Sequence, residues 1–235
     1  MRKTAAALLA AAIAVPMLLG LPTVLAQEGG DTGPVLEIVL TFNQKIFPRK
    51  FGVGYPTCAV WVRDAASGDV RTVYLTRKLA YDKWIFAKQR PSAAPVWYGE
   101  KKREVEASGP LDLDAISSAT PTTETHSIRW PVPDKFRGGS ILVFVEANVS
   151  FDYNDHYPKG TKRGDANYNG YNGQPSVIWR AEVETGDAAA GEIKPVIAGR
   201  GHVLGSNHEI DPDLSTVTTA KDLFLDIRIS YAPGS

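Results

Sequence analysis

Apolar and polar residues alternate in several short segments of the chain, and this alternation predicts β-strands. Residues 35–43 are the first clear example, with one face formed by Leu36, Ile38, Leu40 and Phe42. Glu37 and Thr41 lie on the opposite face, and an apolar period of two is typical of a strand with one buried side. Residues 57–63 and 70–76 are two further strands, and the D-A-A-S-G-D turn between them predicts a hairpin.

The longest predicted strand covers residues 140–151. Its first face is apolar throughout and consists of Ile141, Val143, Val145, Ala147, Val149 and Phe151. Its second face starts apolar and becomes polar, in the order Leu142, Phe144, Glu146, Asn148 and Ser150. We therefore expect one end of this strand to be buried on both faces and the other end to open towards polar surroundings.

The rest of the chain adds strands and no helix. Strands are predicted over residues 176–184, over the less regular 193–198, and over 223–231, where the aligned apolar positions are Leu223, Leu225, Ile227, Ile229 and Tyr231. No segment has the pattern of an amphipathic helix. Residues 77–111 are interpreted as a long connection whose aromatic residues cover one edge of the core or, alternatively, form a platform for a ligand: Trp84, Trp97 and Tyr98. Short strands joined by turns predict an all-β protein, an antiparallel β-sandwich with long loops.

Residues 1–26 have the features of an export signal. Arg2 and Lys3 precede an apolar run, and Val24-Leu25-Ala26 at its end suits a signal peptidase. The run is long enough for a membrane anchor, the alternative, but it is interrupted by Pro16, Gly20 and Pro22. We expect cleavage before Gln27, a flexible leader over 27–34 and a single domain over 35–235. The mature chain is then a periplasmic or extracellular protein without membrane insertion.

Charge and cysteine content exclude some classes of partner and linkage. Removing the signal takes two of the 26 basic side chains away and leaves 24 against 26 acidic ones, a net charge of −2 on 209 of the 235 residues. Both signs are scattered, so nothing favours nucleic acid or an anionic membrane surface as a partner. Cys58 is the only cysteine and forms no internal disulfide; its T-C-A-V-W-V context predicts a small buried side chain instead of a reactive thiol.

Residues 152–175 form a long loop rich in Asp, Asn, Tyr and Gly. These residue types tolerate tight turns and left-handed backbone conformations, so turn formation is their first explanation. Long loops also carry binding residues. The loop is therefore the predicted contact surface, and its candidate binding residues are Asp152, Tyr153, Asn154, Asp155 and His156.

The segment Asp114-Ala-Ile-Ser-Ser-Ala-Thr120 resembles the D-x-x-[S/T]-G-A-[S/T] acceptor at which a flavin transferase attaches FMN to exported proteins. On this resemblance Thr120 is the attachment point, Asp114 the upstream acid, Ser117 the hydroxyl position and Ala119 the small neighbour. The departure is Ser118, where the acceptor pattern has Gly, because a serine side chain blocks conformations that Gly allows. The alternative is a turn whose Asp and Ser side chains cap local backbone N–H groups.

A wider resemblance covers most of residues 35–231. The segment D-A-I-S-S-A-T-P, the spacing from His126 to Trp130, the Gly-Gly turn and the V-F-V-E-A strand are similar to the domain of unknown function 2271 family, which consists of predicted periplasmic proteins. Residues 151–157, 172–176 and 218–220 also resemble members of that family. The resemblance implies an immunoglobulin-like sandwich, as in flagellar hook-capping proteins, and an association with exported flavin and iron redox systems. It implies no particular activity.

Metal and catalytic patterns are sparse. The four histidines have no spacing typical of a metal site, although two of them stand beside carboxylates: His156 near Asp152 and Asp155, and His208 near Glu209, Asp211 and Asp213. No G-x-S-x-G turn, phosphate loop or dinucleotide fingerprint occurs. We therefore predict no catalytic residue, no metal and no cofactor, and a non-catalytic envelope module that binds an unknown envelope protein near redox or iron-handling systems. The alternative is an extracytoplasmic electron carrier with FMN bound covalently at Thr120.

Overall fold

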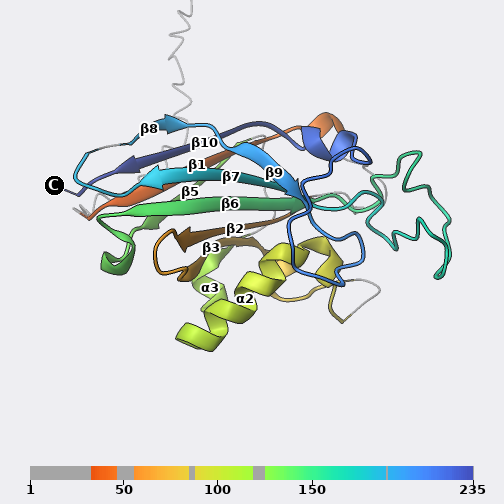
Figure 1. Cartoon of the computed structure of the whole chain (residues 1–235), viewed down its shortest axis with the longest axis horizontal. Coiled ribbons are helices and arrows are strands. Elements are labelled where there is room, and N and C mark those ends of the chain that lie inside the picture. The colour runs from red at the N-terminus through yellow and green to blue at the C-terminus, as the bar shows by residue number, and fades with distance from the viewer. Residues whose placement is uncertain (1–32, 47–55, 85–87, 119–124, 189, 235) are drawn as a thin grey trace, which may run out of the picture. The chain divides into compact units, whose positions relative to one another are not determined.

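The described part of the chain consists mostly of β-strands arranged in two sheets (Figure 1). The computed structural model describes residues 33–46, 56–84, 88–118, 125–188 and 190–234, and Thr32–Ser235 form one compact unit. The proposed export signal and most of the leader therefore lie outside the described residues. The all-β expectation is confirmed at this level.

The strands pair antiparallel almost throughout. The four-stranded sheet has the order β5 (Thr125–Pro131), β1 (Val35–Phe42), β10 (Phe224–Ala232) and β8 (Ala190–Ile193). The six-stranded sheet has the order β4 (Ser117–Ser118), β3 (Val70–Thr76), β2 (Thr57–Asp64), β6 (Ser140–Asn148), β7 (Val177–Glu184) and β9 (Val196–Arg200). The exception to antiparallel pairing is the two-residue contact of β4 with β3.

The main apolar core combines residues from both sheets. In β1 every second residue is buried, as the alternation predicts, and Leu36, Ile38 and Leu40 pack in one cluster with Val143 and Val145 of β6. The predicted hairpin of β2 and β3 is also present, with Arg63 of β2 opposite Val70 of β3. Cys58 lies in this core, where burial raises the pKa of its thiol far above the ordinary value, and its predicted role as a small buried side chain is confirmed.

A second apolar layer covers the outer face of the six-stranded sheet. Helix α2 (Pro95–Ser108) lies over this face, with the shorter α1 (Arg77–Ala80) and α3 (Leu113–Ile116) beside it (Figure 1). Trp97 of α2 is fully buried in one cluster with Trp61 of β2 and Ile178 of β7. The prediction that residues 77–111 form a helix-free connection is therefore wrong.

The polarity of the buried face of α2 explains why its pattern is not amphipathic. Glu100 and Glu104 are both buried, because they bind polar groups of the sheet below. Glu104 Oε2 accepts hydrogen bonds from the backbone N–H of Thr72 at 2.9 Å and from its hydroxyl at 2.6 Å, whereas Glu100 forms an ion pair with Arg63. A buried carboxylate with such partners occupies a position where sequence analysis expects an apolar residue.

Strand β6 is buried on both faces, even along the half in which one face carries polar residues. Glu146 and Asn148 were expected to face polar surroundings, but both are buried. The carboxylate of Glu146 lies under α2, and the Asn148 side chain donates to the backbone oxygen of Gln174 at 3.0 Å. The helical layer, which the sequence pattern did not reveal, accounts for the burial of Glu146, and the backbone at Gln174 provides the partner of Asn148.

Two smaller expectations are corrected near the end of the chain. The segment 193–198 is not one strand: β8 and β9 lie in different sheets and are joined by a short connection. In β10 the apolar alignment breaks at Leu225, which is 59% exposed, while Phe224 packs against the core in its place. A register shift between Thr41 and Phe42, opposite this position, causes the change of face.

Short 3-10 turns complete the described elements: η1 (Gln44–Ile46), η2 (Pro91–Ala93), η3 (Asp134–Phe136) and η4 (Thr219–Asp222). Among the described residues, each helix is too short or too polar to cross a lipid bilayer.

Candidate binding surface

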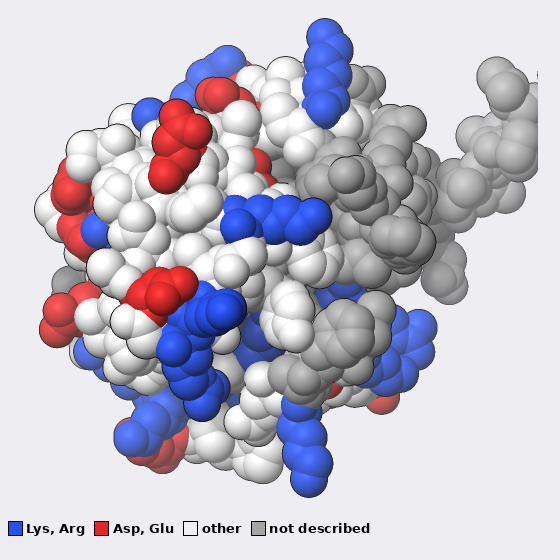
Figure 2. Space-filling model, turned by 90° about the vertical axis from the view of Figure 1, so that its right-hand side faces the viewer, with Lys and Arg blue, Asp and Glu red and all other residues white. Residues whose placement is uncertain are grey.

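The loops that follow β6 and β9 come together at one end of the sheets, which we call the loop end and define as residues 149–176 and 201–219. In Figure 1 these are the teal and blue loops on the right, and Figure 2 views the molecule from that side. The two loops are connected by side chains that are far apart in sequence. Their contacts determine which residues face solvent.

Gln174 is the centre of a buried polar network at the loop end. It is fully buried, and its side-chain oxygen accepts from the backbone N–H of Thr218 at 2.6 Å while its amide donates to the Thr219 hydroxyl at 2.6 Å. That hydroxyl in turn donates to the Asp152 carboxylate at 2.6 Å. Burial raises the pKa of Asp152, while the hydrogen bonds from Thr219 and Gln174 act in the opposite direction. The network joins the loop after β6 to the start of η4.

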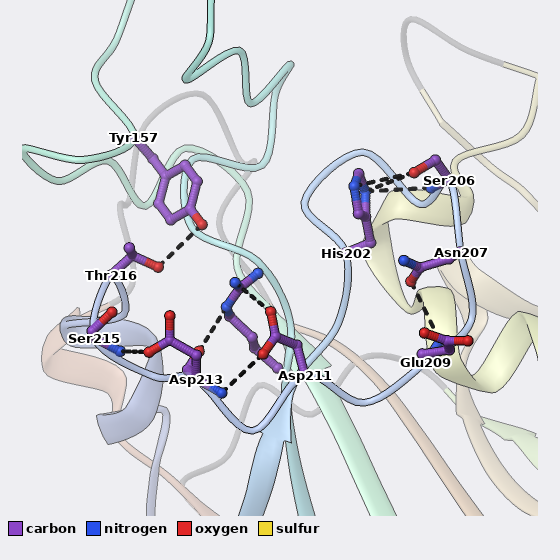
Figure 3. Close-up of polar contacts among 10 residues, drawn as sticks. Tyr157, His202, Ser206, Asn207, Glu209, Asp211, Asp213, Ser215 and Thr216 are labelled. Carbon is purple, nitrogen blue, oxygen red and sulfur yellow. Dashed lines mark hydrogen bonds and ion pairs between the residues drawn. The ribbon is translucent and has the colours of Figure 1, made fainter.

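Asn154 and Tyr157 form a second link between the same loops. The Asn154 amide donates to the backbone oxygen of Thr216 at 2.9 Å, and its oxygen accepts from the backbone N–H of Tyr157 at 2.8 Å. The Tyr157 hydroxyl lies 3.2 Å from that of Thr216, as Figure 3 shows. The backbone of residues 152–157 is therefore held by partners more than fifty residues away.

The five candidate binding residues divide into two groups. Asp152 and Asn154 point inward and hold the loop in place. Asp155 and His156 are exposed at the surface of the same loop, and the half-buried Tyr153 lies with its ring 6.4 Å from that of Phe151. Their composition suggested turn formation and contact together, and the geometry separates the residues that hold the loop from those that are open to solvent.

A cleft of about 280 Å³ lies beside these loops and is lined by Arg200, His202, Asn207, Glu209, Ile210, Asp211 and Pro212. Arg200 pairs with the Asp211 carboxylate at 2.5 Å and donates through Nε to the backbone oxygen of Asp213 at 2.7 Å. Successive turns closed by aspartate side chains follow: Asp211 accepts from the Asp213 backbone N–H, and Asp213 from that of Ser215, each at 2.9 Å (Figure 3). The charged side chains that line this cleft thus stabilise the backbone around the cleft.

The two histidines of the loop after β9 also form hydrogen bonds with backbone atoms. His202 Nδ1 accepts from the backbone N–H of Leu204 at 3.1 Å, and His208 Nδ1 donates to the backbone oxygen of Pro95 at 2.7 Å. The carboxylates that stand beside His208 in the sequence do not converge on it. Within the described ranges, no three residues of the types His, Cys, Asp and Glu gather as metal ligands would.

Glu146 is a buried carboxyl group that the sequence pattern misplaced. It accepts from the backbone N–H of Trp97 at 2.7 Å and of Val96 at 3.3 Å, and from the Ser176 hydroxyl at 2.6 Å. It therefore caps the N-terminus of α2 from the sheet. Burial raises its pKa to about 7, although these three hydrogen bonds favour the charged form. The chain crosses nearby at Gly201, where a Cβ atom would lie 2.5 Å from the Ser176 hydroxyl oxygen, so the crossing requires glycine.

The described part of the flavin-acceptor segment lies at the edge of the six-stranded sheet. Asp112 caps α3 by accepting from the backbone N–H of Ala115 at 3.2 Å, as expected for the turn alternative. Asp114 is exposed and accepts from the Tyr81 hydroxyl, and Ser117 is half-buried in β4. Ala119 and Thr120, the two positions next to and at the attachment point, lie outside the described residues.

Comparisons with protein-family models, with curated proteins and with solved structures found no match for this chain. Two of the structurally central residues were not singled out by the sequence pattern: Glu146 and Gln174. Both stand in segments, residues 143–147 and 172–176, on which the resemblance in the sequence analysis is based.

Proposed function

We propose that the protein is an exported, non-catalytic immunoglobulin-like module of the cell envelope that binds a partner protein through the loop end. The observation that carries this proposal is the buried polar network around Gln174, which holds two long loops in one conformation. A surface that is ordered before binding loses less conformational entropy when the partner arrives. Two packed antiparallel sheets support the immunoglobulin-like part of the proposal.

The exposed residues of the loop end are of the types that interfaces use. Tyr171 is 50% exposed and Leu204 is 43% exposed, and Asp155 and His156 are exposed in the loop that also contains Tyr171. Tyrosine is enriched at protein interfaces because it offers a large apolar area together with a hydroxyl group. A tyrosine-bearing surface with a polar border fits a protein partner of moderate affinity.

The positions of the segments that carry the family resemblance also support a binding role for the loop end. The three late segments that resemble the domain of unknown function 2271 family each contribute to the network, through Asp152, Gln174 and Thr219. We infer from that resemblance that the partner belongs to an exported redox or iron-handling system. The export signal over residues 1–26 supports a location in the periplasm or outside the cell.

Site-specific photo-cross-linking in living cells tests this function. A benzophenone amino acid at position 171 or 156 is expected to give one discrete cross-linked product. The same amino acid at position 196 or 225, whose side chains are exposed on the sheets, is the matched control and is expected to give none. Tyr171→Ala in the chain labelled at position 156 should reduce the yield severalfold, as expected for an anchoring aromatic residue. Equal products from all four positions, or none from the loop end, would contradict the proposal.

The alternative function, an electron carrier with FMN on Thr120, is supported by the exposure of the segment that precedes this residue. Asp114 is exposed and Ser117 and Ser118 are half-buried at a sheet edge, so the described part of the acceptor segment lies at the surface. Co-expression with a flavin transferase should then add the mass of one FMN group, and Thr120→Ala should abolish the addition. Thr122→Ala is the matched control and should retain it. An unmodified mass in the parent chain would rule this function out.

A further inference from the structure

Arg90 is a largely buried cation whose hydrogen-bond partners are neutral. Its guanidinium group donates to the Ser150 hydroxyl at 2.9 Å and to the side-chain oxygen of Asn172. Its Cζ atom lies 5.3 Å from the centre of the Trp84 ring. Burial lowers the pKa of Arg90 to about 10, an effect that the nearby Tyr153 and Tyr171 oppose, so the group remains charged at neutral pH.

Lys78 brings a second positive charge to the same indole ring. Its Nζ atom lies 5.9 Å from the Trp84 ring centre, and the side chain is half-buried. Burial lowers the pKa of Lys78, and the charge of Arg90 lowers it further. The two cations therefore repel each other in partly desolvated surroundings, which is unfavourable without a counter-charge.

The described residues do not supply that counter-charge. No carboxylate among them lies within 4.0 Å of Lys78 or Arg90, whereas the buried Glu100 and Glu104 each have an arginine partner. The nearest acid in sequence, Asp82, forms no ion pair with either cation: one of its oxygens accepts from the Trp84 indole at 3.1 Å and from the Tyr98 hydroxyl at 2.6 Å. An isolated pair of like charges of this kind is a feature of ligand sites.

We propose that Lys78, Trp84 and Arg90 form a binding site for a phosphate group. A phosphate with a charge near −2 neutralises both cations, and a guanidinium fork together with an ammonium group is a common arrangement for phosphate recognition. Both side chains keep part of their surface open to solvent, so an anion reaches them without unfolding the sheet. The half-buried Trp84 ring borders the site and provides an apolar wall for the group that carries the phosphate.

The surface around the site suits an anion. Residues 77–90 contain Arg77, Lys78, Lys83, Lys88 and Arg90, with Asp82 as the single acid, in a chain whose total charge is zero. A locally basic surface attracts anions and increases their rate of association. The phosphate can belong to a soluble phosphate ester or to a phospholipid headgroup.

This site adjoins the loop end, because Arg90 donates to Ser150 and Asn172 of that region, but its own three residues lie outside it and the test below needs no protein partner. Titration with inorganic phosphate, followed by the Trp84 indole N–H resonance of nitrogen-15-labelled protein, tests it. The resonance is assigned by its loss in Trp84→Phe. We expect a saturable shift with phosphate and none with chloride at equal ionic strength.

Variants of the two cations make the test specific. Lys78→Gln should weaken phosphate binding about tenfold, as expected for the loss of one charged contact. Lys101→Gln is the matched control, since Lys101 also lies over aromatic rings, those of Trp97 and Tyr98, but outside the site. Arg90→Lys keeps the charge but loses the guanidinium fork, so it should also weaken phosphate binding, and a cooperative thermal unfolding transition checks that the variant is folded. A titration without saturation, or equal affinity in Lys78→Gln, would overturn the proposal.

Vesicle co-sedimentation separates the two sources of phosphate. Vesicles of phosphatidylcholine alone are compared with vesicles that also contain phosphatidylglycerol. Sedimentation with the anionic vesicles that Lys78→Gln reduces and inorganic phosphate competes away supports a lipid headgroup. Saturable phosphate binding without sedimentation supports a soluble phosphate ester. Absence of both contradicts the site altogether.

Discussion

At the scale of single residues, the described chain repeatedly places polar groups where they are buried and bonded. Glu146, Gln174 and Arg90 each satisfy backbone or hydroxyl groups of segments that are distant in sequence. A buried polar group without a partner costs roughly 1–3 kcal/mol, so these residues determine which conformation of the neighbouring loop or helix is stable. These residues therefore both stabilise the native arrangement of the loops and disfavour other arrangements.

Glu146 should make stability depend on pH. Its pKa is about 7 in the folded chain and near 4.5 in the unfolded chain, so the folded state binds the proton more tightly. The stabilisation is fully present below about pH 4.5 and is lost as the pH rises through about 7, with a total on the order of 3 kcal/mol. Glu146→Gln should flatten the dependence of the unfolding free energy between pH 5 and pH 8, measured by urea denaturation.

The matched control for this measurement is Glu184→Gln, an exposed glutamate at the end of β7. It should leave the pH dependence as in the parent chain. Burial also raises the pKa of Asp152, which contributes a slope of the same sign in every variant. Parallel curves for the parent chain and Glu146→Gln would show that this carboxyl group does not titrate as the geometry requires.

At the scale of elements, α2 is attached to the sheet by charge as well as by apolar contact. Trp97 provides the apolar contact, and its indole donates to the Thr72 hydroxyl at 3.2 Å. Glu104 binds the same residue through its carboxylate. The helix begins with a proline and is followed by Gly109 with φ of 81°, which are the ordinary start and stop signals. Those signals were readable in the sequence, whereas the buried face was not.

Truncating Glu104 tests how strongly the helix is attached. Glu104→Ala should lower the unfolding free energy by about 2–4 kcal/mol, because it leaves the N–H and hydroxyl of Thr72 buried without an acceptor. Glu106→Ala, at an exposed position of the same helix, should change it by less than about 0.5 kcal/mol. Urea denaturation of the three chains measures both. Equal losses would mean that the carboxylate is not what attaches α2.

At the scale of the whole molecule, the sequence predicted the strands better than the layers. Alternation in residues 35–43 and 140–151 located β1 and β6, because each has an apolar face buried against the other sheet. The helical layer escaped prediction, since Glu100 and Glu104 interrupt its apolar face. The loop network also escaped, because Gln174 and Thr218 are 44 residues apart and no local pattern relates them.

The candidate site residues, likewise, could be predicted only where a local pattern in the sequence marked them. Composition predicted a contact surface at the loop of residues 152–175, yet it did not separate the inward Asp152 and Asn154 from the exposed Asp155 and His156. Arg90 had no signal in the sequence, because an arginine in a basic segment normally faces solvent. Its buried position depends on Ser150 and Asn172, which only the folded chain brings to it.

The six-stranded sheet is covered on both faces, and this limits the positions at which its strands can accept amino-acid substitutions. Strand β6 is buried from Val143 to Asn148 without interruption, and β2 is buried from Thr57 to Val62. Neither strand has a row of solvent-facing positions at which substitutions would be tolerated. Variation in this protein should therefore accumulate on the four-stranded sheet and the outer surface of α2, while the middle of the six-stranded sheet tolerates few amino acids at any site.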